Sequence, residues 1–282
     1  MKKLKIKKGT KQIDPHQYEG RLDIEELIIA DTVEVIGEAA FYGCSNLKKI
    51  TWGKRVHTIG LHAFEKCESL KTLYLPNQIK HIEYLAFGHC TGLSYVEFED
   101  NNEVDIWSGA FANCWELTCI ILPNGLKHIP GFSFCGCSKL EDIFIPGTVT
   151  SIGVMAFCGV AAEQIDLPDS IKNIDSQAFY NSKLTSVSIP NSVLTIDESA
   201  FGLCYGLKSV EVGDSVVYIG KMAFAECPSL NEVTFRSTII GSIGTYVFKG
   251  CKGLKRINVP ACAMDQYKRL LPKHLRKKLV EF

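Results

Sequence analysis

The sequence has no long apolar run, no net charge and none of the short motifs that mark common catalytic sites. No apolar segment approaches the ~20 residues that a membrane-spanning helix needs, which excludes a membrane span. The N-terminus is rich in Lys, as a signal peptide is, but no apolar core follows it. We therefore expect a cytoplasmic protein, or a cell-surface or secreted one if the sequence is cut from a longer protein.

Catalytic and metal-binding signatures are missing too. The chain has no glycine-rich phosphate loop, no His-Glu-x-x-His and no Gly-x-Ser-x-Gly. Its seven His are scattered and are expected at the surface, His62 and His89 among them. The neighbouring carboxylates Glu99 and Asp100 have no matched acid or base opposite them. Cys135-Gly-Cys137 lacks a second pair at zinc spacing. We predict no enzyme activity, no cofactor and no metal ion.

Charge is balanced overall but unevenly distributed. The chain has 31 basic and 31 acidic residues, and residues 1–12 hold six Lys and no acid. Residues 265–282 hold six Lys or Arg against two acids, which leaves 19 basic and 29 acidic residues between the two ends. An acidic body argues against a nucleic-acid groove along the strands. The basic ends have two interpretations: solubilised caps, or contacts for an acidic surface.

What the sequence does contain is a repeat. A Phe recurs every 22 to 24 residues, and an Ile stands five positions before each one: Phe41, Phe64, Phe87, Phe111, Phe134, Phe157, Phe179, Phe201, Phe224 and Phe248. Ile13 and Tyr18 form a degenerate eleventh copy upstream. Leu4 and Ile6 stand where a still earlier copy would end. A fixed period of this length predicts one repeat solenoid and not two globular domains.

Each copy predicts two short elements. After Ile196, the apolar residues Ala200, Phe201 and Cys204 have helical spacing over about two turns. The later Val210 and Val212 alternate with polar residues, which predicts a short strand. Stacked copies would pair these strands in parallel. The expected fold is an α/β solenoid of about eleven coils, with a parallel strand ladder on one face and short helical turns on the other.

Eight of the twelve Cys occupy one repeat position, three residues after the Phe. Val160 and Ser182 fill this place in the two remaining copies, which indicates a small buried site where Cys behaves as a hydrophobe. Without an export signal, reduced thiols are expected. Cys119 falls at an outward strand position instead.

We expect residues 1–262 to form the solenoid, with a degenerate repeat and cap at 1–35, and residues 263–282 to form a helical cap. One helix is predicted over 263–271 with Asp265 as its N-cap, and a second over 273–280. The side chains expected to cover the last coil are Leu270, Leu271, Leu275, Leu279 and Val280.

Function is expected at the outward strand positions, because the inward ones are used in stacking. Tyr74, Tyr95, Ile121 and Phe144 fall at such positions on four successive copies, and exposed aromatic patches mark interaction sites. Acidic residues follow, including Asp142 and Asp166. These six residues are the predicted contacts for a protein or peptide partner. The alternative is that the aromatic side chains only pack against one another. Trp107 and Trp115 are expected to form a second exposed patch, whereas Trp52 is expected in the core.

The pattern Ile-Gly-x-x-Ala-Phe, as in Ile152–Phe157, and Cys-x-x-Leu-x-x-Ile-x-Ile-Pro, as in Cys137–Pro146, resembles the BspA-like leucine-rich repeat family. The resemblance covers about residues 13–260, and Asp265-x-Tyr267-Lys268 is similar to the closing segment of bacterial members. It implies a right-handed leucine-rich-repeat solenoid that binds rather than catalyses, with adhesion to host proteins in some members.

The leading hypothesis is a non-enzymatic protein–protein interaction scaffold, which we expect to be a monomer. The alternative is a bacterial cell-surface adhesin that is exported by another route or cut from a longer protein.

Overall fold

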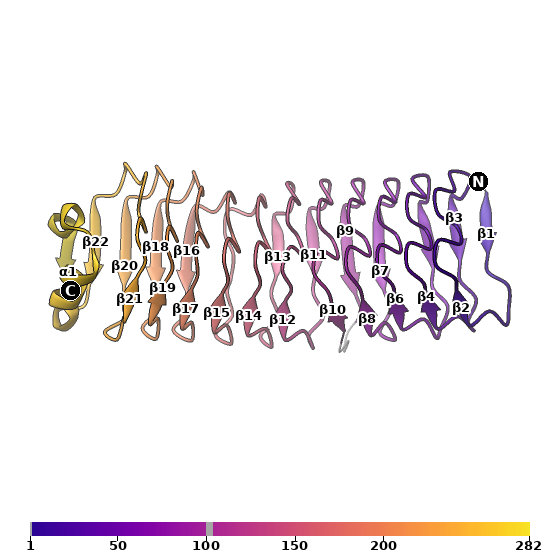
Figure 1. The fold of residues 1–282 in the computed structure, drawn as a ribbon, viewed down its shortest axis with the longest axis horizontal. Helices are drawn as coiled ribbons and strands as arrows, with labels where there is room; N and C mark the ends of the chain where they lie inside the picture. The colour runs from indigo at the N-terminus through magenta and orange to yellow at the C-terminus, as the bar shows by residue number, and fades with distance from the viewer. Residues whose placement is uncertain (1, 100–103) are drawn as a thin grey trace. The chain divides into compact units, whose positions relative to one another are not determined.

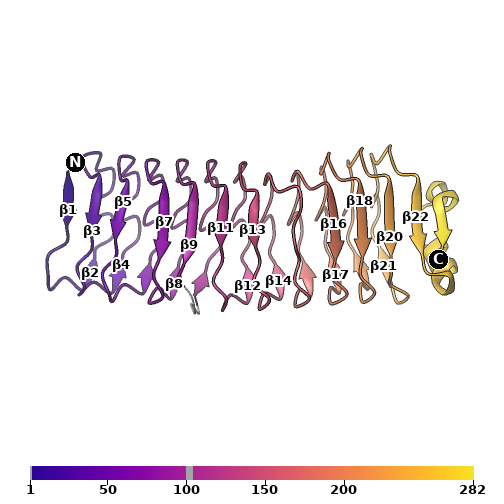
Figure 2. The ribbon, with the colours of Figure 1, turned by 180° about the vertical axis from the view of Figure 1, so that it is seen from behind.

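The computed structural model describes residues 2–99 and 104–282, so Asp100 lies outside the described residues. The chain forms two compact units, Met1–Thr148 and Val149–Phe282, and each is a stack of parallel-stranded coils (Figures 1 and 2). The coils number about twelve, one more than the repeat count predicts. The additional coil is N-terminal, where the strand Lys3–Lys5 pairs in parallel with Glu26–Ile28.

The predicted strand ladder is present in both units. In the first unit it forms the sheets β1-β3-β5 and β7-β9-β11-β13, and in the second it forms β16-β18-β20-β22-β23. Aliphatic side chains point inward and alternate with exposed or half-buried positions, as the period of two predicts. The strands are β1 (Lys3–Lys5), β3 (Glu26–Ile28), β5 (Lys49–Thr51), β7 (Thr72–Leu75), β9 (Tyr95–Phe98), β11 (Cys119–Ile121), β13 (Asp142–Phe144), β16 (Ser186–Ile189), β18 (Ser209–Val212), β20 (Glu232–Phe235), β22 (Arg256–Val259) and β23 (Leu279–Glu281).

A second ladder of two-residue strands was not predicted. The repeat Ile is the second residue of each strand: β2 (Gln12–Ile13), β4 (Val35–Ile36), β6 (Thr58–Ile59), β8 (His81–Ile82), β10 (Asp105–Ile106), β12 (His128–Ile129), β14 (Ser151–Ile152), β15 (Asn173–Ile174), β17 (Thr195–Ile196), β19 (Tyr218–Ile219) and β21 (Ser242–Ile243).

The prediction of short helical turns after this Ile was wrong. The segment that carries Ala and Phe is a run of tight turns, and no α-helix forms there in the described coils. The reason is backbone conformation: Ser199 has φ 54° and Leu203 has φ 56°, on either side of Phe201. A left-handed residue interrupts a right-handed helix. The apolar spacing of four, five and eight is therefore produced by turns.

The turns of successive coils are joined by a regular set of hydrogen bonds, which we call the turn ladder. Around Phe64, three N–H groups donate to carbonyl oxygens of the next coil: His62 to Tyr84 at 3.0 Å, Phe64 to Ala86 at 2.8 Å and Lys66 to Gly88 at 3.0 Å. His62 and Lys66 have positive φ. All three donors therefore point toward the same neighbouring coil. Its carbonyl oxygens supply the hydrogen bonds that these N–H groups would otherwise make within a helix.

The core of each unit is a stack of aromatic rings. In the first unit Tyr18 and the repeat Phe residues up to Phe134 stack with ring centroids 5.1–5.9 Å apart. In the second unit Phe157 to Phe248 stack at 5.1–5.8 Å. Nearly all of these Phe side chains are fully buried. The position therefore accepts an aromatic ring in every coil because each ring packs between two others.

The C-terminal segment differs in part from the prediction. It consists of the 3-10 helix η1 (Ala261–Ala263), the helix α1 (Met264–Leu270), the 3-10 helix η2 (Lys273–Lys278) and β23. The second predicted helix is thus a 3-10 turn and a strand, and Asp265 lies in the first turn of α1 without capping it. Leu271 and Leu275 are buried as expected, but Val280 is exposed. Tyr267 is the main anchor: it is fully buried and its hydroxyl donates to the Ser237 carbonyl at 2.9 Å.

Candidate functional site

The register of the sheet β7-β9-β11-β13 aligns the outward residues in two columns. Thr72 pairs with Tyr95, Tyr95 with Cys119 and Cys119 with Asp142. The second column joins Tyr74, Glu97, Ile121 and Phe144 in the same way. Five of the six predicted contact residues therefore lie on one four-stranded sheet.

Tyr74, Tyr95, Ile121 and Phe144 form what we call the aromatic patch. The side chains of Phe144 and Tyr74 are 62% and 59% exposed, Ile121 is at 37%, and Tyr95 is half-buried. The rings of Tyr74 and Tyr95 lie 6.0 Å apart and are tilted by 55°. They contact each other, but most of the surface of Tyr74 and Phe144 stays open to solvent. Self-packing therefore accounts for only part of the patch.

The patch is acidic at its polar positions. The Tyr95 hydroxyl donates to the Glu97 carboxylate at 2.9 Å, and this hydrogen bond raises the pKa of Tyr95. Asp142 is exposed beside Cys119, and partial burial together with Asp142 raises the pKa of that thiol. The eight outward positions of these four strands include two carboxylates and no Lys or Arg. The sheet therefore presents aromatic surface together with negative charge.

A cavity of about 440 Å³ opens beside Tyr74. Its walls are formed by Trp52, Lys54, Tyr74, Leu75, Pro76, Gln78, Glu97 and Glu99. Trp52 is only half-buried: its ring packs edge-on against Phe64 at 5.9 Å, and its N–H donates to the Tyr74 carbonyl at 2.8 Å. The expectation that Trp52 is a core residue is thus only partly right, because one side of it lines this cavity.

Asp166 belongs to the second unit and is exposed on a stretch where no strand forms. Other outward acids of that unit already have partners within the chain. Glu211 forms an ion pair with Arg236, and the Glu232 carboxylate accepts from Asn258 at 2.7 Å. Asp166 is therefore a separate acidic position in the second unit and does not belong to the aromatic patch.

Two Trp side chains on the turn side are exposed as predicted: Trp107 is 46% exposed and Trp115 is 54% exposed. The Trp107 N–H donates to Asp105 at 2.9 Å. A smaller cavity of about 260 Å³ lies beside Trp107 and is lined also by Tyr84 and His128.

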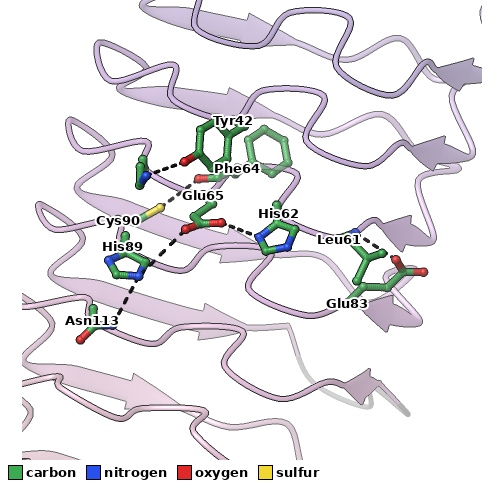
Figure 3. Close-up of polar contacts among 10 residues, drawn as sticks. Tyr42, Leu61, His62, Phe64, Glu65, Glu83, His89, Cys90 and Asn113 are labelled. Atoms are coloured by element: carbon green, nitrogen blue, oxygen red, sulfur yellow. Dashed lines mark hydrogen bonds and ion pairs between the residues drawn. The ribbon is translucent and has the colours of Figure 1, made fainter.

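A buried carboxylate was missed by the sequence reasoning. Glu65 is only 6% exposed and lies between two imidazoles (Figure 3). Its Oε2 is 2.5 Å from His62 Nδ1, and its Oε1 is 4.0 Å from His89 Nε2. His62 and His89 are half-buried, not fully at the surface as expected. Among the described residues the Glu65 carboxylate is hydrogen-bonded to His62 only, and His89 Nε2 also lies 3.5 Å from the side-chain amide of Asn113. The only sequence signal was the His62–Glu65 spacing of three.

The thiols of the repeat Cys residues donate hydrogen bonds to backbone carbonyls. Cys67, Cys90, Cys114 and Cys137 each donate from Sγ to the carbonyl of the Phe one coil earlier, at 3.2–3.4 Å. Burial raises the pKa of Cys90 to about 12. In the described residues, no group of three or more His, Cys, Asp or Glu side chains is placed to hold a metal ion.

The sequence model of the family described as BspA type leucine-rich repeat region (6 copies) matches residues 11–140, 64–183, 104–207 and 172–264. The chain belongs to this family. Its members are leucine-rich repeat proteins, which agrees with the stacked coils of both units. A search of curated proteins finds no match.

Solved structures of bacterial leucine-rich repeat proteins resemble this BspA-type chain. A leucine-rich repeat protein from Bacteroides ovatus is 26% identical over 96% of this chain and 87% of its own, with a TM-score of 0.55. A leucine rich cell surface protein from Faecalibacterium prausnitzii is 26% identical over 92% of this chain and 75% of its own, with a TM-score of 0.52. Within residues 2–99 and 104–282, no helix has the length and apolar character needed to cross a bilayer.

Proposed function

We propose that this BspA-type chain is a non-enzymatic interaction scaffold that binds a protein or peptide on the outward face of β7, β9, β11 and β13. The observation that carries the proposal is the exposure of Tyr74 and Phe144, at 59% and 62%, on a regular sheet whose inward face is fully packed. Large aromatic side chains in that position expose much apolar surface to water, and a bound partner would bury that surface.

The chemistry of the face favours a partner with both apolar and basic side chains. Glu97 and Asp142 supply negative charge beside the rings, and the cavity next to Tyr74 adds Glu99. A Lys or Arg side chain in that cavity would contact an aromatic face and a carboxylate together. Lys54 also lines the cavity but lies 3.8 Å from Asp31, which offsets its charge. Asp166 is proposed as a separate acidic contact in the second unit.

Peptides selected from a displayed random library against the full chain would test this proposal. We expect enrichment of Lys or Arg next to an apolar residue, and a loss of binding of roughly tenfold or more in the Tyr74→Ala/Phe144→Ala variant. Tyr205→Ala is the matched control, because Tyr205 is 56% exposed but lies outside the patch. Selected peptides that bind the double variant as tightly as the unchanged chain would contradict the proposal. Asp166→Lys, measured with the same peptides, tests the separate contact.

A second candidate is adhesion to a host protein at the cell surface. The observation that favours it is the similarity to the Faecalibacterium prausnitzii protein, which is described as a cell surface protein. Protease treatment of intact source cells, followed by immunoblotting, would test it. We expect cleavage of a surface-exposed protein, whereas full protection until the cells are lysed would rule this location out.

A further inference from the structure

The turn ladder of the second unit ends with three unused donors. In the coil around Phe224, the N–H groups of Met222, Phe224 and Glu226 donate to carbonyls of the following coil at 3.0, 3.0 and 2.5 Å. The coils around Phe157, Phe179 and Phe201 have the same three bonds. In the last coil the equivalent N–H groups belong to Tyr246, Phe248 and Gly250, and none of the three has an acceptor among the described residues.

The C-terminal cap leaves this position open. β23 pairs with β22 and so continues the strand ladder, but it adds nothing to the turn ladder. Instead, Pro272, His274, Leu275 and Lys278 of the cap form one wall of a cavity of about 680 Å³, and the last turn, residues 245–252, forms the other. Phe248 lines this cavity and is only 6% exposed, so its N–H is the buried one of the three donors, whereas Tyr246 is 61% exposed. Buried donors are costly when unpaired, which favours an occupant that supplies oxygen atoms.

The cavity is basic. Lys249, Lys252, His274 and Lys278 line it, and Lys249 and Lys252 form no ion pair in the part of the chain that the structure describes. One acid is close to this turn: the carboxylate of Glu226, in the preceding coil, abuts Gly250. Tyr246 and Gly250 have φ of 60° and 78°. Backbone of this kind, with several N–H groups pointing to one side, forms a concavity that attracts negatively charged oxygen.

We propose that this cavity binds an acidic peptide segment in the place that a next coil would occupy. Its backbone carbonyls would accept from Tyr246, Phe248 and Gly250, and its carboxylates would lie near Lys249 and Lys252. An apolar side chain would rest on the apolar part of the walls, which includes Tyr246, Phe248 and Leu275. The first coil of a second copy is a poor occupant, because residues 1–12 carry six Lys and no acid.

This site is separate from the aromatic patch and prefers the opposite charge, so the two proposals fail independently. The probe is a short fluorescein-labelled peptide that alternates Glu and Ala around one Leu, with a counterpart that has Lys in place of Glu. We expect the acidic peptide to bind the full chain and the basic counterpart not to bind at this site. Lys249→Glu/Lys252→Glu is expected to weaken binding roughly tenfold or more. Lys5→Glu/Lys7→Glu is the control and should keep the affinity, since both residues are exposed at the other end of the sequence.

Amide hydrogen exchange tests the backbone contacts directly. The bound acidic peptide should slow the exchange of the Tyr246, Phe248 and Gly250 amides and leave those of Tyr74 and Phe144 unchanged. Unchanged exchange at the three amides would overturn the proposal, as would equal affinity in Lys249→Glu/Lys252→Glu. Protection of the same amides by concentration-dependent dimerisation, detected by sedimentation without peptide, would also overturn it, because the occupant would then be a second copy.

Discussion

The Cys90 thiol donates a hydrogen bond of 3.2 Å to the carbonyl oxygen of Phe64, one coil earlier in the chain. The same oxygen also accepts from the backbone N–H of Cys67 at 3.2 Å. The side chain of Cys90 is fully buried. The thiol therefore fills a small space and occupies the second acceptor site of a buried carbonyl, which an Ala side chain could not do.

Replacing Cys90 by Ala should lower the free energy of unfolding by about 1–3 kcal/mol, because it leaves a small void and removes a buried donor. Chemical denaturation followed by circular dichroism measures this. Cys262→Ala is the matched control, because Cys262 is exposed, and it should change stability by less than about 0.5 kcal/mol. Equal effects of the two substitutions would mean that the thiol ladder adds nothing to stability.

Alkaline pH should destabilise the chain through the same thiols. Burial raises the pKa of Cys90 to about 12 and that of Cys44 to about 11, from an ordinary value of 9.0. Above pH 9 the unfolded chain loses these protons while the folded chain keeps them, so the free energy of unfolding falls as pH rises from about 9 toward 12. Denaturation midpoints at pH 7.5 and pH 10 would show the fall. The fall in the denaturation midpoint should be smaller in Cys90→Val, a substitution that the fold accepts because Val160 fills the same repeat position in another coil. An identical fall in both proteins would mean that other groups cause the effect.

Phe201→Ala should cost about 3–5 kcal/mol, because the ring is fully buried between Phe179 at 5.1 Å and Phe224 at 5.5 Å. Thermal unfolding would report the loss as a large decrease in midpoint. Phe144→Ala removes the same atoms from a side chain that is 62% exposed, and it should leave the midpoint nearly unchanged. A comparable loss in both variants would show that Phe144 has a structural role, and would weaken the case for the aromatic patch as a binding site.

Glu65→Ala should destabilise the fold by about 1–3 kcal/mol, since His62 and His89 would lose their shared partner in a half-buried place. Urea denaturation measures the change, and Glu68→Ala, at an exposed position nearby, is the control. A double-mutant cycle with His62→Ala should give a coupling energy of about 0.5–3 kcal/mol. Additive effects would show that the contact contributes no net stability.

The repeat register made the strand face predictable. Because the spacing of Ile and Phe is nearly constant, the residues between the strand aliphatics could be assigned to columns, and the pairing of Tyr74 with Glu97 and of Ile121 with Phe144 agrees with that assignment. The inward residues could be assigned in the same way, because an alternating strand leaves only one apolar face.

The turns could not be predicted from the same pattern. Ser199 and Leu203 adopt positive φ although neither is Gly. Other coils do have Gly at the place of Leu203, as at Gly43, Gly136 and Gly159, and there φ is positive too. The signal for a left-handed residue was therefore in the sequence, but the apolar spacing was read as a helix instead. Glu65 was hidden for a related reason: it follows the repeat Phe at a place where other coils have Tyr42, Gly88 or Ala112. Its contacts, His62 and His89, come from two adjacent coils and not from the repeat pattern itself.

The turn ladder gives a stack of coils a direction. Where these bonds are formed in the described coils, the turn N–H groups donate to the following coil, as from Phe64 to Ala86 and from Phe201 to Ala223. Inserting or deleting one whole repeat would therefore change the length of the stack without changing the hydrogen-bonding character of its ends. The outermost turn on the C-terminal side stays a row of donors whatever the number of repeats, so sequence variants that differ by whole repeats would keep the same terminus for recognition.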